Sequence, residues 1–129
     1  LTAKAQSADG NQRFFTILVP RPAAEADQAP PLAKATEATN GCSATVTVGG
    51  KEITIAFRDS SAERLEVAGF STDAVAIAIW REVDGTKSGV MAVNATSISR
   101  QGEVLFSSEN PADGAWDLVD GRLVVAVAE

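Results

Sequence analysis

The sequence contains no histidine and no tyrosine among its 129 residues. Histidine is the side chain that most often moves protons near neutral pH, and tyrosine is the usual phenolic acid or base. Their absence excludes Ser-His-Asp and Cys-His catalysis and the common zinc sites that contain histidine. Serines, lysines and carboxylates remain, but none lies in a recognisable catalytic motif or a phosphate-binding glycine loop. We therefore predict that this chain is not itself an enzyme and holds no metal or cofactor.

The chain also has only one cysteine and no long apolar run. Cys42 cannot form an internal disulfide, and at the start of an expected strand it is interpreted as a small buried hydrophobe. The redox compartment stays undetermined. No run approaches the roughly 18 apolar residues of a membrane helix, and no signal segment opens the chain. Because it begins at Leu1, we expect a mature or excised piece of a longer protein.

Positive charge is scarce as well. Lys and Arg number 11 and Asp and Glu number 17, so the formal net charge is −6. A negative surface repels phosphate backbones and anionic membranes, and neither nucleic acid nor a membrane is expected as a partner. The same charge disfavours tight binding of a polyanionic sugar by this domain alone.

What the sequence does contain is two-residue alternation of apolar and polar side chains between glycine-containing turns. This pattern is typical of antiparallel β-proteins, and Gly49-Gly50 and Asp120-Gly121 are strong hairpin signals. About eight or nine short strands predict an all-β, antiparallel β-sandwich. Residues 1–129 are predicted to form this single domain, with a flexible leader at 1–11 and a Pro/Ala-rich crossover loop at 20–41. A further loop is expected at 109–114, "ENPADG", immediately before a closing strand.

The first expected strand, "RFFTILVP" at 13–20, is apolar on both of its faces. The side chains of one face can fill the sandwich core, and those of the other face then need to be shielded from water by another part of the chain or by a partner. The Pro-rich connection at 20–41 can supply that cover. The alternative is a docking face for another domain, formed by Phe15, Ile17, Val19 and Trp80 and extended by Ala76 and Ala78.

The candidates for sugar binding are the two tryptophans and four arginines near the ends of expected strands: Arg58, Arg81, Arg100 and Arg122. Flat aromatic rings stack on sugar rings, and arginine binds carboxylates through paired hydrogen bonds. The competing interpretation is that the rings pack in the core and the arginines form a solvated rim. The candidate carbohydrate contacts are Trp116, Trp80, Arg100 and Arg122. No metal site is predicted, because three acidic residues lack the compact spacing of a calcium loop and are interpreted as solvated turn residues: Asp113, Asp117 and Asp120.

Four segments, taken in order, carry a family resemblance. They are "RFFTILVP" (13–20), "VTVGGKEITIAFRD" (46–59), "GFSTDAVAIAIWRE" (69–82) and "NATSISRQGEVLFSSENPADGAWDLVDGRLVVAV" (94–127). Together they resemble the C-terminal β-sandwich domain of heparinase II/III-like polysaccharide lyases. The resemblance covers the chain from Gln12 to its end, and the order and spacing of the segments carry it rather than any single residue.

The resemblance implies a position after an N-terminal (α/α) toroid and a central β-sandwich. In such lyases tyrosine and histidine of those domains abstract the proton next to a uronic-acid carboxylate and assist departure of the leaving oxygen. Neither residue type occurs here, and Val19 stands where the family often has tyrosine, so no catalytic role is carried over to this chain.

The expected function is thus a non-catalytic accessory domain of a secreted or periplasmic lyase that cleaves acidic polysaccharide by β-elimination. The expected partners are the upstream catalytic domains of the same chain and, secondarily, acidic polysaccharide. The alternative from a different class is a free-standing carbohydrate-binding or immunoglobulin-like interaction module.

Overall fold

A computed structural model describes residues 22–25, 27 and 32–125 of the chain. Those ranges contain one short 3₁₀ helix, η1 (Ala23–Glu25), and ten strands. The strands are β1 (Leu32–Thr36), β2 (Ala38–Thr39), β3 (Gly41–Val48), β4 (Lys51–Arg58), β5 (Leu65–Val67), β6 (Phe70–Thr72), β7 (Ala76–Glu82), β8 (Ser88–Arg100), β9 (Glu103–Val119) and β10 (Arg122–Val125). Every strand pair is antiparallel, so the predicted all-β, antiparallel fold is confirmed.

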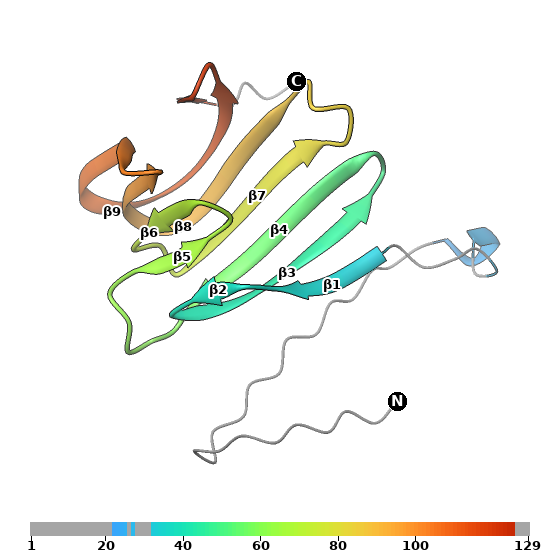
Figure 1. Ribbon diagram of the computed structural model, residues 1–129, viewed down its shortest axis with the longest axis horizontal. Coiled ribbons are helices and arrows are strands. Elements are labelled where there is room, and N and C mark those ends of the chain that lie inside the picture. The colour runs from blue at the N-terminus through green and yellow to red at the C-terminus, as the bar shows by residue number, and fades with distance from the viewer. Residues whose placement is uncertain (1–21, 26, 28–31, 126–129) are drawn as a thin grey trace, which may run out of the picture.

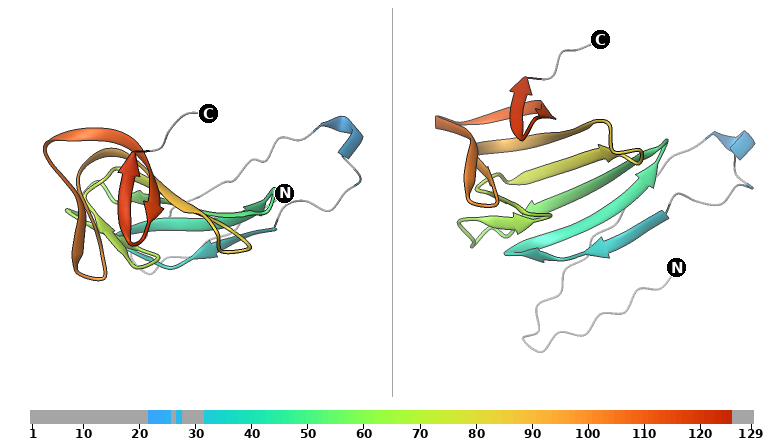
Figure 2. Two further views of the ribbon diagram at one scale, coloured as in Figure 1. Left: turned by 90° about the horizontal axis from the view of Figure 1, so that it is seen from above. Right: turned by 45° about the horizontal axis from the view of Figure 1, so that its top comes forward.

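The ten strands form one hydrogen-bonded sheet whose path folds back on itself (Figures 1 and 2). In order across the sheet they are β1, β3, β4, β7, β8, β6, β5 and β2, while β9 pairs with β8 and β10 pairs with β9. β1 and β2 are neighbours in the chain, yet they lie at opposite ends of this path. The sheet is therefore nearly closed, with a sandwich-like interior between its two halves.

The sheet bends at residues 94–97, in the middle of β8. Up to Val93 this strand pairs with β7, and from Ile98 it pairs with β6. Its register with β9 shifts in the same stretch, and Asn94 has a positive φ of 58°. A bend of this kind takes backbone amides out of the regular ladder, and those amides then need other acceptors.

Two aspartates supply these acceptors. Asp73, between β6 and β7, accepts hydrogen bonds from the amides of Thr96 (2.9 Å) and Ser97 (3.0 Å) and from the Thr96 hydroxyl. Asp113 Oδ1 accepts from the amide of Asn94 at 2.8 Å. Partial burial raises the pKa of Asp73, but these hydrogen bonds outweigh it and hold that pKa below its ordinary value. The bend is thus held by a charged acceptor.

The core lies inside this bend, between the inner face of β4, β7 and β8 and the strands that fold over it. Its fully buried members include Leu65, Ile77, Val90 and Ile98. Trp116 on β9 is 8 % exposed, and its ring centroid lies 4.9 Å from that of Phe106. One compact cluster therefore fills the closed end of the sheet.

The opposite surface of the same strands carries a second set of apolar side chains, which we call the outer apolar face. The strand register places eight of them side by side: Ile53, Ile55 and Phe57 on β4, Ala76, Ala78 and Trp80 on β7, and Met91 and Val93 on β8. Phe57 is 45 % exposed and Met91 is 54 % exposed. Both sides of β4 and β7 are therefore rich in apolar residues. The outer side is exposed at Phe57, Met91 and Val93, whereas next to β4 on the same side Ala44 and Val46 of β3 are buried, at 4 % and 6 % exposure.

The segment predicted as a crossover loop at 20–41 contains two strands, which corrects that part of the prediction. β1 pairs with β3 over five residues, from Leu32–Thr47 to Thr36–Ser43, and β2 pairs with β5. Alanine and lysine, which make up three of the five residues of β1, are poor strand formers, so local propensity gives no signal for this strand. Pairing with the edge of β3 determines its conformation instead.

The loop predicted at 109–114 is also wrong, because these residues lie within β9. Ala112 pairs with Ala95 and Gly114 with Ala92, whereas the ladder with β8 has no pair at Pro111, which lacks an amide hydrogen. β6 is a further strand that the sequence analysis did not predict. Residues 13–20 lie outside the described residues, so the role of Phe15, Ile17 and Val19 in a docking face stays a prediction.

Candidate functional site

The tight turn between β5 and β6 borders three adjoining hollows. Its central residues, Ala68 and Gly69, both have positive φ, at 50° and 81°, which is the geometry of a two-residue hairpin turn. Ala68 contributes to the lining of all three hollows. The turn faces the inner side of β3 and β4, at the end of the sheet that the core does not fill. The hollows at this end are lined largely by polar residues.

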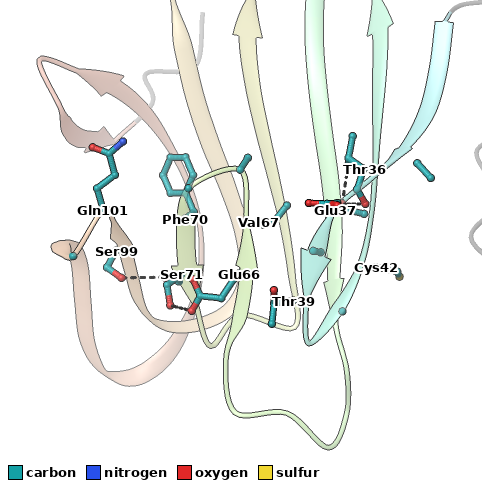
Figure 3. A pocket seen from close by; sticks show the side chains of 17 residues that line it. Thr36, Glu37, Thr39, Cys42, Glu66, Val67, Phe70, Ser71, Ser99 and Gln101 are labelled. Atoms are coloured by element: carbon teal, nitrogen blue, oxygen red, sulfur yellow. Dashed lines mark hydrogen bonds between the residues drawn. The ribbon is translucent and has the colours of Figure 1, made fainter.

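The largest hollow measures about 850 Å³ and is drawn in Figure 3. Thr36 and Glu37 lie on one side of it, and Ser99 and Gln101 lie on the other. Between them Ser71 donates a hydrogen bond to Glu66 at 2.7 Å and accepts one from Arg64 at 2.8 Å. Its lining is rich in hydroxyl groups, and its only charged lining groups are two glutamates.

A second hollow, of about 370 Å³, lies on the inner face at the other side of the turn. We call it the basic pocket, because three cationic side chains line it together with one carboxylate: Arg81, Lys87, Arg100 and Glu52. Thr54 and Ser88 add hydroxyl groups, and Ile79 and Leu118 add apolar surface. Its lining carries an excess of two positive charges on a chain whose formal net charge is −6.

The cations of the basic pocket come from elements on different sides of it. Arg81 on β7 is paired with Glu52 on β4, with Nη2 3.0 Å and Nε 3.1 Å from Oε1. The Arg100 guanidinium at the end of β8 lies 5.4 Å from the centroid of the Phe70 ring. Among the described residues, Arg100 has no carboxylate partner within ion-pair distance. One arginine is thus partly neutralised, whereas the other is held only against an aromatic ring.

Lys87 is positioned by the turn between β7 and β8. Asp84 Oδ1 accepts hydrogen bonds from the amide of Thr86 at 3.0 Å and from its hydroxyl at 2.7 Å. These hydrogen bonds, from the amide first and the hydroxyl second, lower the pKa of Asp84 below its ordinary value. The turn closes with the Glu82 amide donating to the Lys87 carbonyl at 2.8 Å. The lysine therefore projects from an ordered turn, although its side chain is exposed.

Arg100, one of the four predicted sugar contacts, lines the basic pocket. Trp80 also borders this pocket, but the strand register places its indole on the outer apolar face, beside Ile53 and Gly89. Trp80 lies opposite Gly89 in the β7–β8 register, and Lys51 Nζ lies 4.7 Å from the centroid of its ring. A Cβ atom at position 89 would lie 2.5 Å from Trp80 Nε1 and 2.7 Å from the backbone oxygen of Trp116. The position of the indole therefore depends on a glycine in the neighbouring strand.

We expect Gly89→Ala to lower the free energy of unfolding by about 2 kcal/mol, the usual cost of overpacking. The added methyl group meets both a rigid ring and the backbone of β9, so neither neighbour can move away freely. Thermal unfolding followed by tryptophan fluorescence measures the loss. Gly85→Ala serves as the comparison, because a Cβ there meets no atom within 4 Å but takes a positive φ of 78°. An unchanged midpoint and emission maximum for Gly89→Ala would contradict this packing.

The other predicted sugar contacts lie away from the basic pocket. Trp116 is buried against Phe106 and Gly114, so it offers almost no ring surface to a sugar. Arg122 is exposed on β10, outside the lining of the pocket. Arg81, one of the four arginines considered for sugar carboxylates, also lies in the lining of the basic pocket. Lys87 and Phe70 were not predicted as contacts.

The cysteine and the remaining acidic residues form no evident reactive site. Cys42 is half-buried opposite Phe57 on the outer side and lines the largest hollow. Within the described part of the chain, no group of three or more histidine, cysteine or acidic residues has a geometry that could hold a metal ion. No helix in that part is long and apolar enough to cross a bilayer. No protein-family model matches the sequence, and no curated protein matches it at a significant level.

Proposed function

We propose that this chain is a non-catalytic accessory domain of a secreted or periplasmic heparinase II/III-like polysaccharide lyase that acts on acidic polysaccharide by β-elimination. In this role it packs against the upstream catalytic domains through its outer apolar face and stabilises them. The observation that carries the proposal is the exposure of two large apolar side chains of β8 on the outer apolar face, Met91 (54 %) and Val93 (50 %).

The size and place of the outer apolar face support a domain partner. Soluble monomers seldom leave a wide contiguous apolar surface in water, and covering one large side chain contributes roughly 1.5–3 kcal/mol. The chain enters the described sheet at the edge strand β1, beside β3, whose outer residues adjoin those of β4. Two features of the sequence agree with a supporting role. Histidine and tyrosine are absent, and four segments resemble those of the lyase domain in their order along the chain.

The test compares the parent protein with charge substitutions on the outer apolar face. We expect Met91→Lys with Val93→Lys to lower the parent's melting temperature and its release of ultraviolet-absorbing unsaturated product. A matched control, Val119→Lys with Val124→Lys, changes residues of equal exposure, 50 % each, on β9 and β10. These control substitutions should leave both measurements close to those of the parent.

Two results would overturn the accessory role. One is unsaturated product formed by the 129-residue chain alone. The other is a natural gene that encodes only this domain and a leader. The second result would favour a free-standing carbohydrate-binding or interaction module, for which the specific observation is that Arg81, Lys87 and Arg100 line one pocket.

A further inference from the structure

We propose that the basic pocket binds a short sugar ligand that carries a single carboxylate group, such as a uronic acid at a chain end. This site goes beyond the accessory role, and it could operate whether or not the outer apolar face packs against another domain. The proposal rests on the arrangement of Arg81, Lys87 and Arg100 around one hollow of about 370 Å³.

The charges of the pocket favour an anion. Arg81 is held by Glu52, which leaves Lys87 and Arg100 as the cations that no described carboxylate contacts within 4 Å. Arg100 is at the same time ordered by the Phe70 ring, so little side-chain freedom is lost when it binds a ligand. A guanidinium of this kind presents paired N–H donors that match the two oxygens of a carboxylate.

The same charges limit the size and charge of that anion. The neighbouring hollow across the β5–β6 turn contains Glu37 and Glu66, and the chain carries a formal net charge of −6. A polyanion that continued from the basic pocket into that hollow would meet carboxylates of its own sign. One negative group seated near Arg100 avoids this repulsion, so a short ligand is favoured over a long charged chain.

The remaining lining fits a sugar ring. Ligand sites combine mostly apolar walls with a few polar groups that set orientation. Ile79 and Leu118 provide apolar surface for the C–H groups of a ring, and Thr54 and Ser88 provide hydroxyl groups that can exchange hydrogen bonds with ring hydroxyls. A sugar that carries a carboxylate can contact the cations, the hydroxyl groups and the apolar surface of this lining. An inorganic anion lacks the C–H groups that would contact the apolar surface.

The experiment titrates the 129-residue chain with D-glucuronate and follows backbone amide shifts by NMR. We expect saturable binding at about millimolar concentration, as is usual for a ligand of this size, and no saturation with D-glucose. Shifts should centre on Arg81, Lys87 and Arg100. Raising the salt concentration from about 50 to about 500 mM should weaken the binding, because the charges are partly exposed.

Charge-matched variants decide the assignment. Arg100→Gln should weaken glucuronate binding about tenfold or more, since it removes a charged hydrogen-bond partner. Lys87→Gln should also weaken it, and this exposed turn position is unlike Arg100 in having no aromatic partner whose loss could disturb the fold. Arg122→Gln makes the same change of charge on β10, outside the pocket, and should leave the affinity unaltered.

Several outcomes would overturn the proposal. These are the absence of saturable glucuronate binding, equal effects of Arg100→Gln and Arg122→Gln, and equal binding of glucose. Binding of sulfate or phosphate as tight as that of glucuronate would make the pocket a general oxyanion site without sugar selectivity. The proposed preference for a ligand with one carboxylate would be overturned if trigalacturonate, which has three, bound more tightly per carboxylate than glucuronate. None of these results depends on the parent lyase, so they are separable from a failure of the docking role.

Discussion

Replacing Trp116 by alanine is expected to lower the free energy of unfolding by about 3–5 kcal/mol, the usual loss for removing a large aromatic side chain from a core. The ring is 8 % exposed and lies 4.9 Å, centroid to centroid, from Phe106 with the planes tilted by 48°. Its other neighbour is Gly114, where a Cβ atom would lie 2.4 Å from the ring. Phe106 and the backbone of β9 are held by the surrounding sheet, so we expect them to fill little of the space left by the indole.

Chemical denaturation followed by circular dichroism measures this loss of free energy. In thermal denaturation we expect the melting temperature to fall by about 10 °C or more. Trp116→Phe is the matched variant, because it keeps an aromatic contact with Phe106 and should lose well under half as much. The result also decides between the two interpretations of this residue. A Trp116→Ala protein with unchanged stability and lost sugar binding would make the ring a binding surface, in contradiction to its burial.

Replacing Asp73 by alanine is expected to lower the free energy of unfolding by about 3 kcal/mol, because hydrogen bonds to a charged acceptor contribute more than neutral ones. Three donors, the amides of Thr96 and Ser97 and the Thr96 hydroxyl, lose their common partner at the bend of β8. Asp113→Ala is the control, since this exposed carboxylate accepts from the single amide of Asn94 and should cost about 1 kcal/mol. Equal losses for the two variants would show that Asp73 has no special part in holding the bend.

The stabilisation by Asp73 should also depend on pH in a defined direction. Its pKa in the folded protein lies below the ordinary aspartate value of 3.8, so the folded state binds the proton less readily than the unfolded state. The contribution is therefore complete well above pH 3.8 and is lost as the pH falls below that value towards the lower folded pKa. Asp73→Asn should differ most from the native chain near neutral pH, and the difference should narrow in acid. A constant difference down to pH 2 would contradict this.

Local sequence patterns were sufficient for the hairpins and most strands. Gly49-Gly50 and Asp120-Gly121 both have positive φ and connect paired strands, as their sequence predicts. The alternating residues on either side of Gly49-Gly50 correspond to the paired strands β3 and β4. These features depend on residues next to each other in the chain. β1 and the middle of β9 were missed, because their own residues favour a loop and pairing with β3 and β8 sets their conformation.

The candidate site was only partly predictable, and for a related reason. Arg100 was among the predicted contacts, but nothing local indicated that this residue of β8 would share a pocket with Lys87. Trp116 carries the same side chain as Trp80, yet it lies on the inner face, opposite Val90 in the β8–β9 register. The sequence analysis left both environments open for each ring.

The sequence by itself determined the class of fold, the position of the tight turns and the lack of imidazole and phenol chemistry, because each follows from composition or from neighbours along the chain. Only the tertiary structure decided which side of each strand faces inward. On β4 the threonine side, which continues to Ala56, faces the interior, and the side with Ile53, Ile55 and Phe57 faces out. The alternation of side chains along a strand shows only that its two faces differ. The bend at 94–97 brings β6 over one of these faces, and that face becomes the core.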